Sequence, residues 1–233
     1  VAQQQARLDE AEAHYRQALD IALEFNDRRN IGPNYYQLGN VAQQQARLDE
    51  AEAHYRQALD IALEFNDRRN IGANYYQLGN VAQQQARLDE AEAHYRQALD
   101  IELEFNDRGN AAITYHQLGN VAQQQERFDE AQSYYRHVLR LSSDLNDQHL
   151  SAVAYQRLGE IASEQRRFKQ AAEAFVNAAI LWQKLHREWP MESLTALGRL
   201  RRELSPEELG EVLNTREASA LIGILNAIND NRE

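Results

Sequence analysis

The chain of 233 residues contains no cysteine, only 3 prolines and 10 glycines, and no long run of apolar residues. The missing cysteines exclude disulfides, thiolate metal sites and cysteine nucleophiles. The few prolines and glycines argue against long disordered linkers. A mean hydropathy of -0.73, with apolar runs of only a few residues, predicts that no segment spans a membrane.

Basic residues are also scarce. There are 25 of them against 36 acidic residues, which gives a formal net charge of -11, and the only lysines are Lys169 and Lys184. Non-specific binding to nucleic acids or membranes depends on cationic patches. We therefore expect neither nucleic acid nor a membrane as a partner.

What the sequence does contain is repetition. Residues 1–40 and 41–80 differ only at Pro33 and Ala73, and residues 81–120 differ from 41–80 at seven positions. A fourth copy, 121–160, has diverged further, and a fifth begins at Ile161. Self-similarity at a fixed period, here 40 residues, is typical of repeat architectures.

Each copy has the periodicity of two helices. Ile71, Tyr75, Leu78 and Ala82 are spaced 4, 3 and 4 residues apart, which predicts a first helix, helix A, at about 68–85. A second helix, helix B, is predicted at about 90–105 from the same spacing, which begins at Ala91 and continues through Tyr95 and Ala98.

Local signals predict where these helices begin and end. Asp89, with Glu92 three residues later, has the capping-box spacing and is expected to cap helix B. Asn106 suits a left-handed residue after helix B, and Asp107 can cap the next helix A. Gly79, with Ala91 and Ala98, is expected to let the two helix backbones approach closely.

The pattern Tyr-x-x-Leu-Gly on helix A and Ala-x-x-x-Tyr-x-x-Ala on helix B resembles the tetratricopeptide repeat (TPR) family. The resemblance covers about residues 1–187, and its positions in one copy are Tyr75, Leu78, Gly79, Ala91, Tyr95 and Ala98. The Leu-Gly-Asn triplet and the long repeat resemble the subtype found in Pins-type adaptors and kinesin light chains. The resemblance implies an all-α fold: a right-handed superhelical solenoid of antiparallel helix pairs.

The expected domains are a TPR array at 1–189 and non-repeat capping helices at 190–233. The array comprises a half-repeat at 1–30 and units at about 31–70, 71–110, 111–150 and 151–189. In the second domain we predict helices at about 191–203, from Pro206 after the capping signal of Ser205, and from about Arg216. Their expected role is to cover the open apolar end of the array.

The sequence begins within a helix A, so we expect that upstream repeats are missing. The half-repeat is then expected to expose Tyr15 and Leu19 and to form a weak homodimer through residues 1–30. We expect a cytoplasmic location.

No catalytic motif is present: the sequence lacks a dinucleotide-binding glycine pattern, a phosphate-binding loop and a serine-nucleophile pattern. Glu50 and His54 have the i, i+4 spacing of metal ligands, but the repeat supplies no further histidine nearby, and a solvated polar pair is the favoured interpretation. We therefore expect no enzymatic activity, no metal and no cofactor.

A second face of helix A predicts a binding site. In the TPR family helix A lines the concave surface, and the resemblance implies that the offsets of Tyr76, Asn80, Gln83 and Gln84 contact a bound peptide. Amide side chains both donate and accept hydrogen bonds, so they can pair with the backbone of an extended segment. The alternative is that these residues are only a solvated inner wall. The predicted groove residues are Tyr36, Asn40, Gln43, Gln44, Tyr76, Asn80, Gln83, Gln84, His116, Asn120, Gln123, Gln124, Glu160 and Glu164.

This strip contains neither lysine nor arginine, so it departs from the carboxylate-clamp pattern of the family. The expected function is a scaffold that binds a protein or peptide segment in the concave groove. Two alternatives stay open. One is a regulatory domain of a larger signalling enzyme, an ATPase or a protease, whose catalytic part lies upstream. The other is a structural array that assembles with itself.

Overall fold

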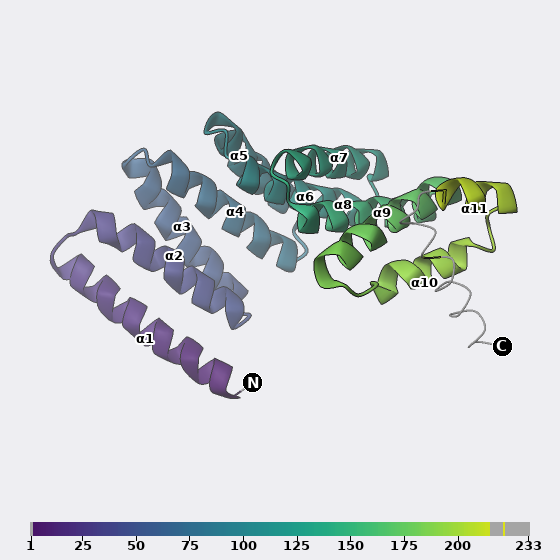
Figure 1. Ribbon diagram of the computed structural model, residues 1–233. Helices are drawn as coiled ribbons and strands as arrows, with labels where there is room; N and C mark the ends of the chain where they lie inside the picture. Colours follow the sequence, from purple (N-terminus) through teal and green to yellow (C-terminus); the bar gives the residue numbers. More distant parts are fainter. Residues whose placement is uncertain (1, 215–220, 222–233) are drawn as a thin grey trace. The chain divides into compact units, whose positions relative to one another are not determined.

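The computed structural model describes residues 2–214 and 221 (Figure 1). Within these residues there are eleven α-helices and no strand, which confirms the predicted all-α fold. The helices are α1 (Ala2–Glu24), α2 (Arg28–Gln44), α3 (Leu48–Glu64), α4 (Arg68–Gln84), α5 (Leu88–Glu104), α6 (Arg108–Gln124), α7 (Phe128–Asp144), α8 (Gln148–Glu164), α9 (Phe168–His186), α10 (Met191–Leu200) and α11 (Pro206–Val212).

The chain divides into two compact units, one ending at Val121 and one beginning at Ala122. In the first unit, each of the helices α1 to α5 packs against its neighbour in the chain. In the second unit, α8 packs against α7 and α9, and α9 also contacts α10 and α11. Each helix buries its apolar face only by stacking on the next one, because short turns connect them.

Tyrosines on the second helix of each pair form the centre of the core. Tyr55, Tyr95 and Tyr135 are fully buried. In the first unit, a cluster of small and branched side chains surrounds Tyr55, among them Ala51, Ala62, Ile71, Leu78 and Val81. Ile71 and Leu78 are residues that the 3.6-residue period assigned to the apolar face of helix A.

The glycine that recurs on helix A makes room for an aromatic ring of helix B and not for its backbone. This corrects the expectation that the glycine lets the two helix backbones approach closely. A Cβ atom added to Gly79 would lie 2.7 Å from the ring of Tyr95, and one added to Gly39 would lie 2.6 Å from the ring of Tyr55. Gly159 is in the same position against Phe175, at 2.8 Å. A side chain at any of these positions would displace a buried ring.

Each turn that joins two successive helices from α1 to α9 contains a residue with positive φ. Asn106, with φ of 52°, confirms the predicted left-handed residue after helix B. The turns from helix A to helix B use other residues: Ala46 and Ala86, with φ of 57° and 58°, and Glu126 and Arg166, both with φ of 58°. In these turns the N–H of Arg87 donates to the carbonyl of Ala82 at 2.8 Å, which closes the helix end. Alanine is strained in this conformation because its Cβ approaches the backbone.

The capping prediction is confirmed for helix A and is wrong for helix B. The Asp67 carboxylate accepts from the backbone N–H of Asn70 at 3.2 Å, and Asp107 does the same for Asn110. Asp89, however, is not the cap of α5: the cap position is Arg87, without a side-chain hydrogen bond, and Asp89 lies in the first turn. There its charge still interacts favourably with the helix dipole.

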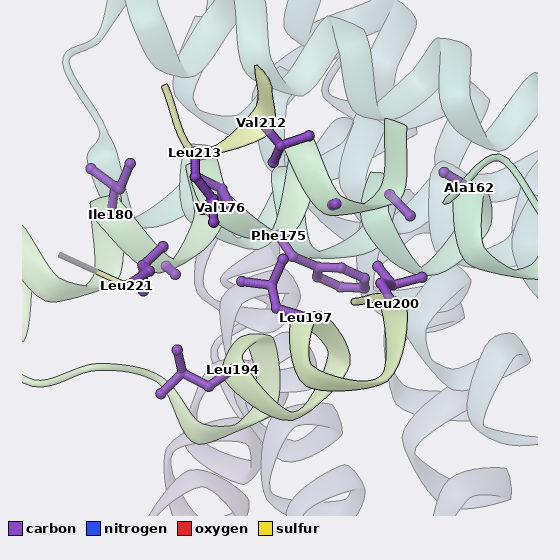
Figure 2. Close-up of a cluster of buried hydrophobic side chains, with 13 residues drawn as sticks. Ala162, Phe175, Val176, Ile180, Leu194, Leu197, Leu200, Val212, Leu213 and Leu221 are labelled. Carbon is purple, nitrogen blue, oxygen red and sulfur yellow. The ribbon is translucent and has the colours of Figure 1, made fainter. Parts of the chain in front are cut away.

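In the second unit, α10 and α11 pack against α9 around Phe175. Figure 2 shows the Phe175 ring close to Leu197 and Leu200, with Leu194, Val212 and Leu213 in the same cluster. The Ser205 capping box at the start of α11 is present as predicted, and α10 ends three residues earlier than the expected helix 191–203. The helix predicted from Arg216 lies outside the described residues.

The expectation that Leu19 is exposed is wrong. Leu19 is buried in a cluster with Ala22, Ile31 and Leu38, because α2 packs on this side of α1. Tyr15 is half-buried, whereas its equivalents Tyr55 and Tyr95 are fully buried.

Candidate peptide-binding groove

The predicted strip of amides is hydrogen-bonded to the tyrosines beneath it. The Tyr95 hydroxyl lies 2.8 Å from Asn80 Oδ1 and 2.9 Å from Gln83 Oε1, and either oxygen can accept its proton. One copy earlier, the Tyr55 hydroxyl is in the same position between Asn40 and Gln43. Burial raises the pKa of the Tyr95 phenol, so the hydroxyl keeps its proton and remains a donor.

A second glutamine, which the sequence analysis did not select, links successive copies. Gln77 Nε2 donates to the Tyr36 hydroxyl at 3.1 Å and to Asn40 Oδ1 at 3.4 Å. Gln117 donates to Asn80 Oδ1 at 3.3 Å in the same way. The only sequence signal for this role is that the glutamine recurs one residue after Tyr36 and Tyr76.

These hydrogen bonds use most of the donors and acceptors of the Asn80 side chain. Its Oδ1 accepts from Tyr95 and Gln117, and its Nδ2 donates one hydrogen to Gln77 Oε1 at 2.8 Å. An amide side chain has two donor hydrogens and two acceptor lone pairs. Tyr76 is a further hydrogen-bond partner of Asn80, so this amide is occupied within the repeat, whereas Gln44 and Gln84 on the same strip are exposed.

Two equivalent pockets, one copy apart, lie beside the strip in the first unit. The first pocket has a volume of about 650 Å³ and lies among α2, α3 and α4, where Tyr36, Gln37, Ala62 and Phe65 line it. The second pocket, of about 590 Å³, lies among α4, α5 and the start of α6. The corresponding residues Tyr76, Gln77, Glu102 and Phe105 line it, and Tyr36 reaches it as well.

The two pockets differ in one ionisable group. Ala62 of the first pocket is replaced by Glu102 in the second, and Asn74 is replaced by Thr114. The Thr114 hydroxyl donates to Glu102 Oε1 at 3.0 Å. Burial raises the pKa of the Glu102 carboxyl to about 7, with a further contribution from the negative charge of Asp107, while the Thr114 hydrogen bond opposes the shift.

The remaining predicted groove residues are divided between the two units. In the first unit, Asn120 donates to Gln117 Oε1 at 2.8 Å and lies 3.4 Å from His116 Nδ1. In the second unit, Gln123 accepts from Tyr135 at 3.3 Å, and Gln124 is exposed.

Glu160 and Glu164 belong to a more acidic site. They line a pocket of about 610 Å³ between α8 and α10, together with Gln156 and Ser163. Glu160 accepts from Gln156 at 3.1 Å and from Arg157 at 2.9 Å. Burial raises the pKa of Glu164, as do the charges of Glu160 and Glu126.

The Glu10–His14 pair is exposed, as expected of a solvated pair, but the equivalent pairs at Glu50–His54 and Glu90–His94 are more enclosed. His54 Nε2 lies 3.6 Å from Glu50 Oε1, and only 18% of the His54 side chain is exposed because its ring stacks on Tyr35 at 5.9 Å. His94 has the same neighbours, and burial lowers its pKa. In the part of the chain that the structure describes, no group of three possible ligands could hold a metal ion.

Stacked helix pairs with a polar strip on the first helix of each pair define an α-helical repeat protein. The sequence profile of the tetratricopeptide repeat matches residues 1–64, 33–104, 70–144 and 110–179, so the chain belongs to this family. TPR repeats imply a scaffold for protein–protein interaction.

Two solved structures share the fold. BtubC (BKLC) from P. vanneervenii matches with a TM-score of 0.72 and 21% sequence identity, over 97% of this chain and 92% of that protein. MamA matches with a TM-score of 0.62 and 17% identity, over 80% of this chain and 95% of that protein. A search of curated proteins found no significant match.

No helix among residues 2–214 is both long and apolar enough to cross a membrane.

Proposed function

We propose that the chain binds an extended protein segment along the strip of Tyr36, Asn40, Gln44 and their equivalents, without catalysing a reaction. The observation that carries this proposal is the pair of equivalent pockets spaced one copy apart. An extended segment could place side chains in both pockets while its backbone pairs with amides of the strip. A half-buried tyrosine in each pocket adds apolar contact area at a small cost in conformational entropy.

The amides differ in how well they test this proposal. Asn80 supports the buried Tyr95 hydroxyl, so Asn80→Ala would change the packing as well as the groove. Gln44 and Gln84 are exposed, and a larger side chain there blocks the strip without disturbing the core. Gln17 and Gln57 are exposed on α1 and α3, outside the strip, and serve as matched controls.

The experiment selects binding peptides from a random library of 12-residue peptides with the unmodified chain. Their affinities are then measured for the double variant Gln44→Arg, Gln84→Arg and for the control Gln17→Arg, Gln57→Arg. We expect the strip variant to lose about tenfold or more in affinity, since two contacts of about 1 kcal/mol each are removed. The control should change less than about twofold. Equal affinities would move the binding site away from the strip.

We further propose that α10 and α11 cap the repeat array, since Leu194, Leu197 and Leu200 cover the Phe175 side of α9. The long repeats also favour the subtype of Pins-type adaptors and kinesin light chains, because α2, α4, α6 and α8 begin at 28, 68, 108 and 148. Removing residues 190–233 should lower the unfolding temperature and make the shortened chain associate, as measured by calorimetry and sedimentation. A shortened chain that is as stable and as monomeric as the original would contradict the capping role.

A weak homodimer through residues 1–30 is a separate proposal. It is supported by the partial exposure of Tyr15 and by Phe25, of which 74% is exposed. Sedimentation at several concentrations tests it: a concentration-dependent dimer should form, and Tyr15→Glu should abolish it. A chain that is monomeric at high concentration would rule the homodimer out.

A further inference from the structure

Glu102 is an ionisable side chain that the repeat does not need. At the same position of the preceding copy, Ala62 is buried and packs in the core cluster. Glu102 Oε1 accepts from Thr114, but Oε2 is buried and has no hydrogen-bond partner. A buried carboxylate oxygen without a partner destabilises the fold, so its presence points to a ligand.

Aromatic rings surround the space beside this carboxyl. Tyr36, Tyr76 and Phe105 line the second pocket together with Glu102. The faces of aromatic rings attract cations within about 6 Å of the centroid. The Arg69 guanidinium already lies 5.5 Å from the centroid of Phe105, which shows that a cation is accommodated beside one of these rings.

The charges that line the second pocket sum to a negative value. Glu102 and Asp107 are acidic, and Arg69 from α4 is the only basic residue that lines it. In the first pocket, Arg29 and Asp67 balance each other, and Ala62 is neutral. The two pockets lie at equivalent places in successive copies, and Glu102 gives the second pocket a carboxyl group where the first has the methyl group of Ala62.

From this difference we propose that the second pocket takes a basic side chain, lysine or arginine, of the bound segment, whereas the first pocket takes a neutral one. The cation pairs with the Glu102 carboxylate and lies against the rings of Tyr36 and Tyr76, which line the same pocket. This inference rests on the proposed function, because it names the partner chemistry of the same groove.

The proposal makes binding dependent on pH. Glu102 must be ionised to attract the cation, and with a pKa of about 7 its ionised fraction rises about tenfold between pH 6 and pH 8. The titratable and charged groups facing it are Tyr36 from α2, Arg69 and Tyr76 from α4, and Asp107 before α6. Burial raises the pKa of Tyr76 from its ordinary value near 10, so this phenol does not titrate in this interval.

The test uses peptides selected at pH 8 from the random 12-residue library. Three variants of the full chain are compared with the original: Glu102→Gln, which keeps an acceptor for Thr114 without the charge; Glu102→Ala, which copies the first pocket; and Ala62→Glu with Asn74→Thr, which copies the second pocket into the first. Unfolding curves verify that each variant is folded.

We expect the selected peptides to share one basic position. Replacing that residue by norleucine should weaken binding about tenfold in the original chain and less than about twofold in Glu102→Gln and Glu102→Ala. Binding of the basic peptide should tighten about tenfold from pH 6 to pH 8 in the original chain only. Selection with the Ala62→Glu, Asn74→Thr variant should enrich a second basic position.

Failure of this inference can be distinguished from failure of the proposed function. Peptides that lack a shared basic position, or that bind Glu102→Gln as tightly as the original, overturn the cation pocket. If the same peptides still lose affinity for the variant Gln44→Arg, Gln84→Arg, the proposal that the strip binds an extended segment is supported. Peptides that are insensitive to the strip variant, or a library that yields no binder, contradict both proposals.

Discussion

The first and second pockets are built from copies of one duplicated unit. Comparing them separates the residues that pack every copy from the residues that differ at the candidate site. Residues 41–80 and 81–120 differ at seven positions, and the helices built from them have the same lengths and the same tyrosine–amide bonds. One of the differences, Ala62/Glu102, falls at the pocket walls, and Thr114, which replaces Asn74, donates a hydrogen bond to Glu102. The two copies thus have the same packing, whereas their pocket walls differ by one carboxyl group.

The largest expected effect tests whether the two copies are packed alike. Gly79→Leu should lower the free energy of unfolding by about 3 kcal/mol, because its side chain would overlap the buried Tyr95 ring. Gly39→Leu should cost a similar amount against Tyr55. Urea unfolding measures both changes.

The control for the glycine prediction is Gly198→Ala in α10, where an added Cβ meets nothing within 4 Å. It should leave the stability unchanged or raise it by up to about 1 kcal/mol. A loss at Gly198 equal to that at Gly79 would show that general helix effects, and not the ring contact, explain the result.

The second prediction concerns the one residue that distinguishes α2 from α4. Pro33 lies inside α2 and cannot donate to the carbonyl of Arg29, so Pro33→Ala should stabilise the chain by about 2 kcal/mol. The reverse change, Ala73→Pro in α4, should destabilise it by a similar amount. Thermal unfolding measures both changes. Equal unfolding temperatures for both variants and the original chain would contradict the prediction.

The third prediction uses the ionisation of Glu102, which has no counterpart at Ala62 of the first pocket. Folding raises the Glu102 pKa from 4.5 to about 7, so the folded chain binds this proton more tightly than the unfolded chain. The resulting stability is fully present below pH 4.5 and is lost as the pH rises through about 7. Because Glu102 is only half-buried, we expect a loss of about 1 kcal/mol relative to Glu102→Gln. Unfolding curves from pH 5 to pH 8 measure it, and parallel pH profiles for the two chains would contradict it.

The smallest effect is expected in the turns that both copies share. Ala86 has φ of 58°, so Ala86→Gly should relieve strain and stabilise the chain by about 0.5–1 kcal/mol. Ala53 is exposed within α3, and Ala53→Gly should instead cost about 1 kcal/mol. A destabilising Ala86→Gly would mean that the left-handed turn is not strained.

Helix positions were predictable because they depend on local periodicity. The expected ranges 68–85 and 90–105 lie within two residues of α4 and α5 at every boundary. The cap at Asp89 was wrong because a carboxylate two residues inside a helix has the same sequence signature as one at its start. The exposure of Leu19 was misjudged because the neighbour that buries it, α2, comes after it in the chain.

The candidate site was predictable only as a strip of polar side chains on helix A. The offsets of Asn80 and Gln83 followed from the helix period and the family resemblance, but the hydrogen bonds that occupy Asn80 join residues 15 and 37 positions apart. No local pattern distinguishes Gln77, whose bonds to Tyr36 and Asn40 depend on how α4 lies beside α2.

The sequence by itself determined the helical repeat, the buried tyrosines and the polar strip, because periodicity and duplication are properties of the chain in one dimension. The tertiary structure decided that the glycines accommodate rings, that successive copies are joined through Gln77 and Gln117, and that Glu102 lies half-buried in a pocket with aromatic walls. These features arise between helices, where separation and burial set both the hydrogen-bond partner of an amide and the pKa of a carboxyl.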